Sequence, residues 1–463
     1  MSREQAIEHA EHYFDDGGFF DDLARRVAIP TESQNPDRAA DLRRYLTDEL
    51  QPSYTRSDFR CQVFDNPVAG AGPLLLAERI EDPTKTTVLS YGHGDVIRGQ
   101  DASWRVGLHP WHLQRDGDRL YGRGTADNKG QHTINLAAVE AVLATRGHLG
   151  FNLKVLIETG EEVGSPGLRE FCEQQSERLA ADVFIASDGP RLRPDQPTIF
   201  LGSRGALNMD LVVDLREGGH HSGNWGGLIA NPGIMLAHAL ATITGPKGEI
   251  RVPEWRPDSL TPSVRKALAG LQVDGGADGP AIEPDWGEPG LSPAERVFGW
   301  SSFEVLAFTC GNPDRPVNAI PPKASCHCQL RFVVGVDPSD IVGALQRHLD
   351  KAGFGMVQVT SARDGFFTAT RLDPDHPWVG WTVDAITRTT GSPPAILPNL
   401  GGSLPNDIFA DVLGLPTVWI PHSYASCNQH APNEHMLASV ARDALRLMAG
   451  VVWDLGEVDI QRS

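Results

Sequence analysis

The feature that most constrains the fold is an alternation, over residues 1–203, of short apolar runs with segments of helical spacing. The two kinds of segment follow one another along the chain, with strands expected at 86–97, 153–160 and 181–189 and helices at 129–147 and 165–179. Strands that are joined by helices form βαβ units, and such units build a mainly parallel sheet. We therefore predict an α/β fold.

A different pattern begins near Arg204. Its strands and helices are expected in the order β-α-β-β-α-β, at 205–215, 234–243, 302–310, 323–335, 338–354 and 356–365. This order is the split βαβ, or ferredoxin-like, arrangement, which folds as an independent two-layer unit. Between its first helix and second strand, residues 245–300 are rich in Pro and Gly, and we expect an elaborated loop with one helix near 262–270.

The α/β pattern resumes after about Asp373, with a strand at 415–421 and a terminal helix near 434–455. The smaller unit is therefore inserted into the larger one. We predict two domains, a larger one formed by 1–203 with 371–463 and an inserted one formed by 204–370. The chain has 463 residues, which is longer than the chain that one hydrophobic core usually supports, and this agrees with a division into two domains.

Composition narrows the classes of partner. The chain has 41 basic and 60 acidic side chains, a formal charge of −19, so its surface repels polyanions. We expect neither nucleic acid nor an anionic membrane as a partner. The six cysteines are scattered without a CxxC pair, and neither a signal-peptide region nor a membrane-spanning run is visible. A cytoplasmic location is expected.

Five polar clusters stand where predicted strands end or helices begin. They are His93-Gly94-Asp95, the loop 121–131 with Asp127, the pair Glu161-Glu162, Asp188 in ASDGP, and NQHAPNEHM with His430 and His435. Each has an ordinary explanation taken singly: a polar turn, a helix N-cap, a pair of solvated acids, an Asp-Gly-Pro turn and a capped loop.

Taken together, the clusters point to metal chemistry. In open α/β sheets, ligands collect beyond the carboxyl ends of the strands, so the clusters are expected to meet at one edge. They supply two imidazoles and three or four carboxylates. Such a mixed nitrogen and oxygen set suits two divalent ions such as zinc, cobalt or manganese, and it lacks the thiolates of a structural zinc site.

In the order of these motifs, the chain resembles the dinuclear zinc peptidase and deacylase family. This family includes carnosinase, aminoacylase, acetylornithine deacetylase, succinyl-diaminopimelate desuccinylase and glutamate carboxypeptidase. Eight motifs follow the family's order, namely HGD, YGRGTADNKG, GEEVGS, ASDG, GHHSGNWGG, IPPKASCHCQLRFVVG, GGSLP and HAPNE. The likeness covers nearly the whole chain. The β-α-β-β-α-β unit is similar to the family's lid and dimerisation domain.

The resemblance implies a site for two divalent ions, with zinc expected and cobalt or manganese as alternatives. Asp127 would bridge the two ions. His93 and Asp188 would complete one site, and Glu162 and His430 would complete the other.

The resemblance also implies two residues that act beside the ligands. Asp95 would orient His93, as a carboxylate often does for a metal-bound imidazole. Glu161 would be the general base, which takes a proton from the metal-bridging water and passes it to the leaving nitrogen.

Several positions of the inserted unit and the following turn match substrate-contacting residues of the family. His221, in HHSG, would reach the active site of the partner subunit and stabilise the oxyanion, which implies a homodimer. Arg331 would hold a substrate carboxylate, although a strand-surface charge is its ordinary alternative. Asn231 and the Gly402–Ser403 turn would contact the substrate.

We expect a metal-dependent hydrolase that cleaves the amide bond of dipeptides or short peptides. Asp188 favours this branch, because an aspartate here resembles carnosinase, whereas the deacylases usually have glutamate. An N-acyl or N-carbamoyl amino acid amidohydrolase is the alternative enzyme. A non-catalytic binding protein on the same fold is the alternative outside the enzyme class, and the presence of Glu161 with all five ligands argues against it.

Overall fold

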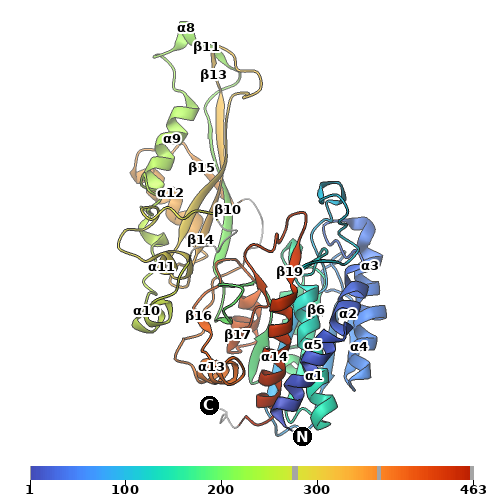
Figure 1. The fold of residues 1–463 in the computed structure, drawn as a ribbon. Helices are drawn as coiled ribbons and strands as arrows, with labels where there is room; N and C mark the ends of the chain where they lie inside the picture. The colour runs from blue at the N-terminus through green and yellow to red at the C-terminus, as the bar shows by residue number, and fades with distance from the viewer. Residues whose placement is uncertain (1, 274–279, 362–366, 459–463) are drawn as a thin grey trace.

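Two sheets organise the structure, a computed structural model that describes residues 2–273, 280–361 and 367–458. An eight-stranded sheet forms the centre of a broad body, and a four-stranded antiparallel sheet forms a narrow lid that projects from it (Figure 1). The start of the first helix, Arg3–Asp15, and the end of the last, Ala438–Leu455, lie side by side at the base of the body, away from the lid (Figure 1).

The large sheet is parallel at its centre, and it has antiparallel pairs at one edge and at a single position between β17 and β9 near the other. Its strands are, in spatial order, β1 (Arg60–Phe64), β2 (Leu74–Arg79), β6 (Asn152–Glu158), β3 (Thr87–His93), β7 (Val183–Ala186), β17 (Thr417–Trp419), β9 (Thr198–Phe200) and β16 (Ala395–Leu397). β3 pairs in parallel with both β6 and β7, and β7 pairs in parallel with β17. The predicted α/β fold with a mainly parallel sheet is confirmed.

Helices cover both faces of this sheet because its strands are apolar on both sides. In β2, Leu75 belongs to one hydrophobic core and Leu76 to the other, since successive side chains of a strand face opposite ways. The first core is covered by α1 (Arg3–Asp15), α2 (Gly18–Val27), α4 (Gln51–Arg56), α5 (Lys129–Arg146), α13 (Pro377–Thr390) and α14 (Ala438–Leu455). The second is covered by α6 (Leu168–Gln174), α7 (Ser176–Leu179), α10 (Pro262–Leu268) and α11 (Pro293–Phe298).

The lid has the predicted order β-α-β-β-α-β. Its sheet runs β12 (Ser302–Cys310), β14 (Lys323–Phe332), β10 (Gly205–Asp214) and β15 (Gln358–Ser361), and its helices are α9 (Pro232–Ile243) and α12 (Ile341–Lys351). Alternate residues of β10, such as Leu207 and Met209, face the core beneath these helices. Residues 362–365 of the strand expected at 356–365 lie outside the described residues. The domain boundaries at 203 and 371 stay a proposal.

The stretch at 245–300 differs from its prediction. Besides the expected helix α10, it contains α11, which begins with a capping box formed by Ser292 and Glu295. The S-P-A-E sequence there is a readable helix start, so the signal was present. Both helices pack into the second core of the body, with Leu268 and Phe298 buried there, rather than onto the lid sheet.

Two helix boundaries also differ. The terminal helix expected from 434 begins at Ala438, because His435–Leu437 form a strand, β19, that pairs with β5 (Arg119–Tyr121). The helix expected at 165–179 is two short helices, α6 and α7, that are separated at Gln175. Within the described part of the chain, no helix is both long and apolar enough to cross a membrane.

Candidate metal centre

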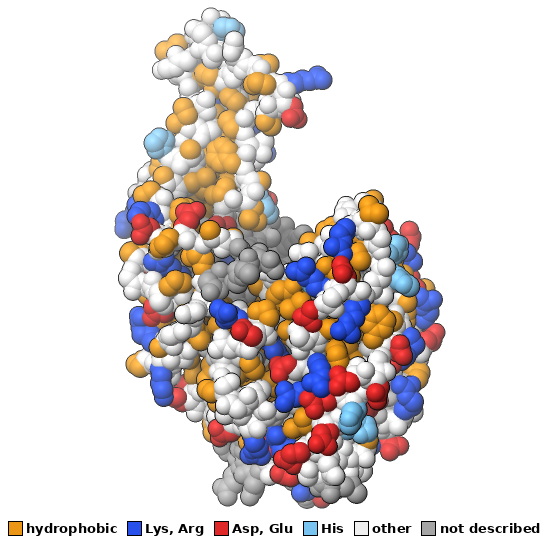
Figure 2. Space-filling model, in the orientation of Figure 1, with side chains coloured by type: hydrophobic (Ala, Val, Ile, Leu, Met, Phe, Trp, Pro, Cys, Tyr) orange, Lys and Arg blue, Asp and Glu red, His pale blue; other side chains and the backbone are white. Residues whose placement is uncertain are grey.

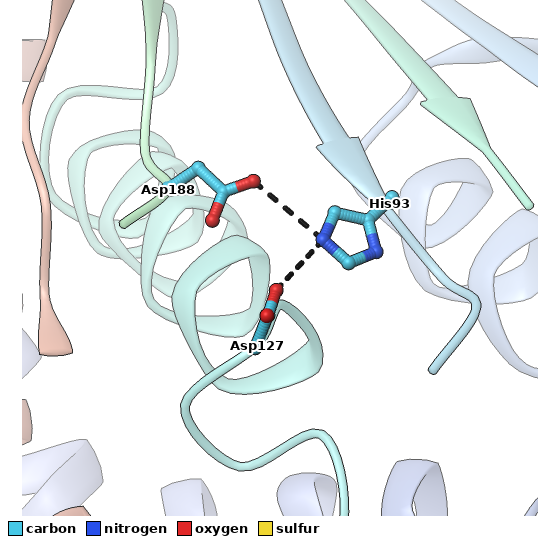
Figure 3. Close-up of side chains that lie close together, drawn as sticks. All are labelled: His93, Asp127 and Asp188. Carbon is cyan, nitrogen blue, oxygen red and sulfur yellow. Dashed lines mark hydrogen bonds and ion pairs between the residues drawn. The ribbon is translucent and has the colours of Figure 1, made fainter. Parts of the chain in front are cut away.

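Three buried side chains meet at the carboxyl end of the large sheet (Figure 3). His93 is the last residue of β3, Asp188 follows β7, and Asp127 precedes α5. His93 Nε2 lies 2.9 Å from Asp127 Oδ1 and 3.5 Å from Asp188 Oδ2. The strand-end positions explain the meeting, because parallel strands bring their carboxyl ends to one edge.

A second group shares Asp127 with the first. Its other members are Glu162, in the single turn η4 (Glu161–Val163), and His430. His430 Nε2 lies 3.1 Å from Asp127 Oδ2 and 2.9 Å from Glu162 Oε2. The two oxygens of Asp127 therefore face different groups, each of which offers nitrogen and carboxylate ligands of the kind that divalent ions take.

Asp95 supports both sides of this arrangement. Its backbone oxygen lies 3.0 Å from His93 Nδ1, and its Oδ1 lies 3.4 Å from the same nitrogen. Its carboxylate also accepts the backbone N–H groups of Glu161 and Glu162, at 3.2 and 3.1 Å. Asp95 therefore contacts both the imidazole of His93 and the turn that carries the paired glutamates.

The crowding of acids shifts their protonation. Burial, followed by the charge of Asp127, raises the pKa of Glu162 to about 7 and that of Asp188 to about 6. Burial also raises the pKa of Glu161 well above its ordinary value. Hydrogen bonds to Asp127 and Glu162 raise the pKa of His430 to about 11. A divalent cation would reverse these shifts, because it favours charged carboxylates and neutral imidazoles, so the residues fit such an ion.

A cleft of about 1230 Å³ extends from these side chains toward the base of the lid. Arg331, Gly402 and Ser403 line it together with Glu161 and the metal-ligand candidates other than His93. Arg331 donates from Nη1 to Ser403 Oγ at 2.8 Å and from Nε to Gln329 Oε1 at 3.0 Å. Within the described ranges, Arg331 has no ion-pair partner, and its side chain lines the cleft.

The structure does not bring two of the predicted substrate residues to this cleft. His221 lies in β11 (His220–His221), beside α8 (Ser222–Trp225) at the far tip of the lid, and it is exposed (Figure 1). Asn231 caps α9, where its side chain accepts the backbone N–H groups of Gly233 and Ile234.

Three residues near the cluster were not singled out from the sequence. Gln429 donates its amide to Asp127, and Glu434 accepts the backbone N–H of Asp127. Glu158, the last residue of β6, accepts hydrogen bonds from Tyr91 at 2.7 Å and Ser165 at 2.8 Å, and burial raises its pKa to about 7. The strand-end rule that located His93 also applies to Glu158.

Residues 89–454 match Peptidase family M20/M25/M40. The Beta-Ala-His dipeptidase of Mus musculus is 31% identical over 389 residues, which cover 78% of this chain and 75% of that protein. The Cys-Gly metallodipeptidase dug1 of Schizosaccharomyces pombe is 25% identical over 475 residues, which cover 94% of this chain and 95% of that protein. The structure of the M20 family metallo-carboxypeptidase Sso-CP2 from Sulfolobus solfataricus matches with a TM-score of 0.78 at 25% identity, covering 95% of this chain and 99% of that chain.

These matches confirm the resemblance that the order of the motifs indicated. The family match extends from β3 through the lid to α14, and so it includes all five ligand candidates. The matched proteins are peptidases, which confirms the prediction of an enzyme rather than a non-catalytic relative. The chain belongs to Peptidase family M20/M25/M40 and is an enzyme that hydrolyses amide bonds.

Proposed function

We propose that this peptidase is a metal-dependent dipeptidase with two divalent ions at its active site. The observation that carries the proposal is the shared carboxylate, since Asp127 directs one oxygen to each of two ligand groups. Asp127 would bridge the ions, with His93 and Asp188 on one side and Glu162 and His430 on the other. We propose zinc for both, with cobalt or manganese as alternatives. Two such ions, when bound, lower the pKa of a water and polarise the scissile carbonyl.

Glu161 is the proposed general base. It lines the cleft beside the ligand groups, and its backbone N–H is held by Asp95 Oδ1 at 3.2 Å, so its position is set by the same residue that orients His93. It takes a proton from the attacking water and delivers it to the amine nitrogen as the amide bond breaks.

Arg331 supports a substrate with a free carboxylate. Its guanidinium lines the cleft and has no ion-pair partner among the described residues, and it donates a 2.8 Å hydrogen bond to Ser403 Oγ. A guanidinium binds a carboxylate in a defined geometry, which would limit the length of peptide between the metal centre and Arg331. Gly402 and Ser403, which line the cleft, are the further proposed substrate contacts. Asn231 caps α9 outside this cleft, so a substrate contact by Asn231 belongs to the proposed dimer rather than to its own chain's site.

A homodimer in which His221 serves the partner's active site is also part of the proposal. His221 contacts none of the ligand candidates of its own chain, and the segment 221–230 around it is largely exposed. Figure 2 shows apolar side chains, in orange, along the lid. The exposed large apolar side chains of this part of the chain include Trp225, Leu228, Ile234, Val305, Leu306, Phe308 and Val317. Val305, Leu306 and Phe308 belong to β12, an edge strand of the lid sheet, and an apolar edge of this kind favours pairing with another chain.

An N-acyl or N-carbamoyl amino acid amidohydrolase is the second candidate, because Arg331 would hold the carboxylate of those substrates equally well. A panel of free-amine dipeptides, N-acetyl amino acids and N-carbamoyl amino acids separates the two. We expect the highest kcat/KM with dipeptides. A higher kcat/KM for the blocked amino acids would contradict the dipeptidase proposal and leave the metal centre unaffected.

Removal of metal by a chelator should lower the activity by at least ~10²-fold without unfolding the protein. The body and the lid have their own hydrophobic cores, which do not depend on the ligand groups. Activity, circular dichroism and recovery after metal is returned are the measurements. Unfolding of the metal-free protein, or full turnover by it, would contradict a catalytic metal centre.

Metal affinity should fall as the pH is lowered from 8 to 5. Glu162 and Asp188 have raised pKa values without a cation, about 7 and about 6, so protons compete with metal below those values. The metal-free fold should instead become more stable as the pH is lowered. An acid whose pKa is raised by burial favours the folded state when it is protonated and disfavours it when it is charged. Titration with metal at several pH values, and thermal melts of the metal-free protein, test the two signs.

A further inference from the structure

Glu434 connects two segments of the metal centre, the loop that carries Asp127 and the segment that carries His430. It precedes β19 and is 1% exposed. Its Oε1 accepts the backbone N–H groups of Gly124, Ala126 and Asp127 at 3.1, 3.0 and 3.1 Å. Its Oε2 accepts Arg123 Nη1 at 2.9 Å. One carboxylate therefore holds the backbone of the loop that carries Asp127.

The partner of Glu434 is an equally buried guanidinium. Arg123 is 1% exposed and lies over the ring of Trp104, 5.7 Å from its centroid. Its Nε and Nη2 have no hydrogen-bond partner within the described part of the chain. Glu434 therefore compensates the charge of Arg123. Because both side chains are buried, water cannot replace either partner, and the pair keeps one geometry.

The segment that carries Glu434 also carries His430. The backbone between them is unusual, since Asn428, His430 and Asn433 have φ values of 57, 60 and 64°, in the left-handed region that residues other than Gly seldom adopt. Such conformations persist only where surrounding contacts hold them. The side chain of His430 is itself 55% exposed, so packing around the imidazole gives it little support.

The two ligand groups thus differ in how they are held. His93 ends β3 and Asp188 lies two residues after the end of β7, and both strands are in the interior of the large sheet. His430 depends on a loop, and that loop is tied to Asp127 through the hydrogen bonds of Glu434. We propose that Glu434 is a positioning residue that sets the distance between Asp127 and His430 and thereby the metal affinity of the second ligand group. This inference rests on the proposed two-metal function.

The test is a titration of metal-free protein with Co²⁺, in which binding is measured by calorimetry and by visible absorption. Wild-type protein should bind in two steps, and the step that His430→Ala removes is assigned to the second group. Glu434→Gln keeps the shape of the side chain but replaces one carboxylate oxygen with an NH₂ group. That group cannot accept the hydrogen bonds that the oxygen accepts in the wild-type protein. We expect it to weaken the assigned step by ten- to a hundredfold, and the other step by less than about threefold.

Asp454→Asn is the matched control. Asp454 is a buried carboxylate with arginine partners, Arg3 at 2.8 Å and Arg388 at 2.9 Å, at the opposite end of α14, ~24 Å along the helix from the His430 loop. This variant should lower Tm without changing either Co²⁺ step. Glu434→Gln with wild-type Co²⁺ affinity, or with losses in both steps no larger than those of Asp454→Asn, would overturn the positioning role.

A second variant covers failure of Glu434→Gln to fold. Arg123→Lys keeps a positive charge beside Glu434 but cannot reproduce the guanidinium geometry, and it should weaken the same Co²⁺ step. An unchanged step in this variant would also overturn the proposal. Absence of two Co²⁺ steps in the wild-type protein is a different result, because it would contradict the two-metal function itself.

Discussion

Glu161→Gln should lower kcat by at least ~10²-fold while the protein keeps its full metal content. Glu161 belongs to neither of the two ligand groups, yet it lines the same cleft. The amide of glutamine preserves size and polarity but does not accept the proton of the attacking water. KM should change little, because the variant removes a group that is needed for proton transfer rather than for binding.

Glu162→Gln is the matched comparison one residue away. The Oε2 of Glu162 lies 2.9 Å from His430 Nε2, within the second ligand group. We expect this variant to lose about one of two bound ions, since a neutral amide is a weaker ligand than a carboxylate. Metal analysis and kinetics of both purified variants decide the assignment. Metal loss in Glu161→Gln with full occupancy in Glu162→Gln would mean that the two roles are exchanged.

Mixing two nearly inactive variants, Glu161→Ala and His221→Ala, should restore about a quarter of the wild-type activity. The structure places His221 at the exposed tip of the lid, where it pairs with Ala319 of β13 (Ala319–Ile320) and accepts the Gly223 N–H at its Nδ1, at 3.2 Å. If His221 completes the partner's site, a mixed dimer contains one site with both lesions and one site with neither. Random exchange makes about half of the dimers mixed, and half of the sites in those dimers are intact.

The two proteins must be dissociated together and reassembled, and the formation of mixed dimers must be shown by a mass tag on one of them. Each variant reassembled alone is the control for recovery by refolding. If His221 serves its own subunit, every site in the mixture keeps one lesion and no activity returns. That outcome, with mixed dimers present, would contradict the shared site and leave the metal chemistry untouched.

The sequence by itself determined the architecture and the positions of the ligand candidates. Periodicity is a local property, so the alternation over residues 1–203 predicted the α/β body, and the order of elements after Arg204 predicted the lid. His93 and Asp188 were predictable for the same reason, because each is found by locating the end of an apolar strand and parallel strands end at one edge. The motif order then supplied Asp127, whose own pattern reads equally well as a helix cap.

Only the tertiary structure decided how these residues are held. Glu434 reads as a loop acid in the sequence, and its role depends on a contact with Asp127, 307 residues away. The packing of α11 into the body, where Phe298 joins the second core, likewise depends on a surface that is distant in the chain. The distance of His221 from the ligand groups follows from the length and direction of the lid (Figure 1). Local patterns specify which segments become strands and helices, whereas burial and charge compensation between distant segments arise only when the chain has packed.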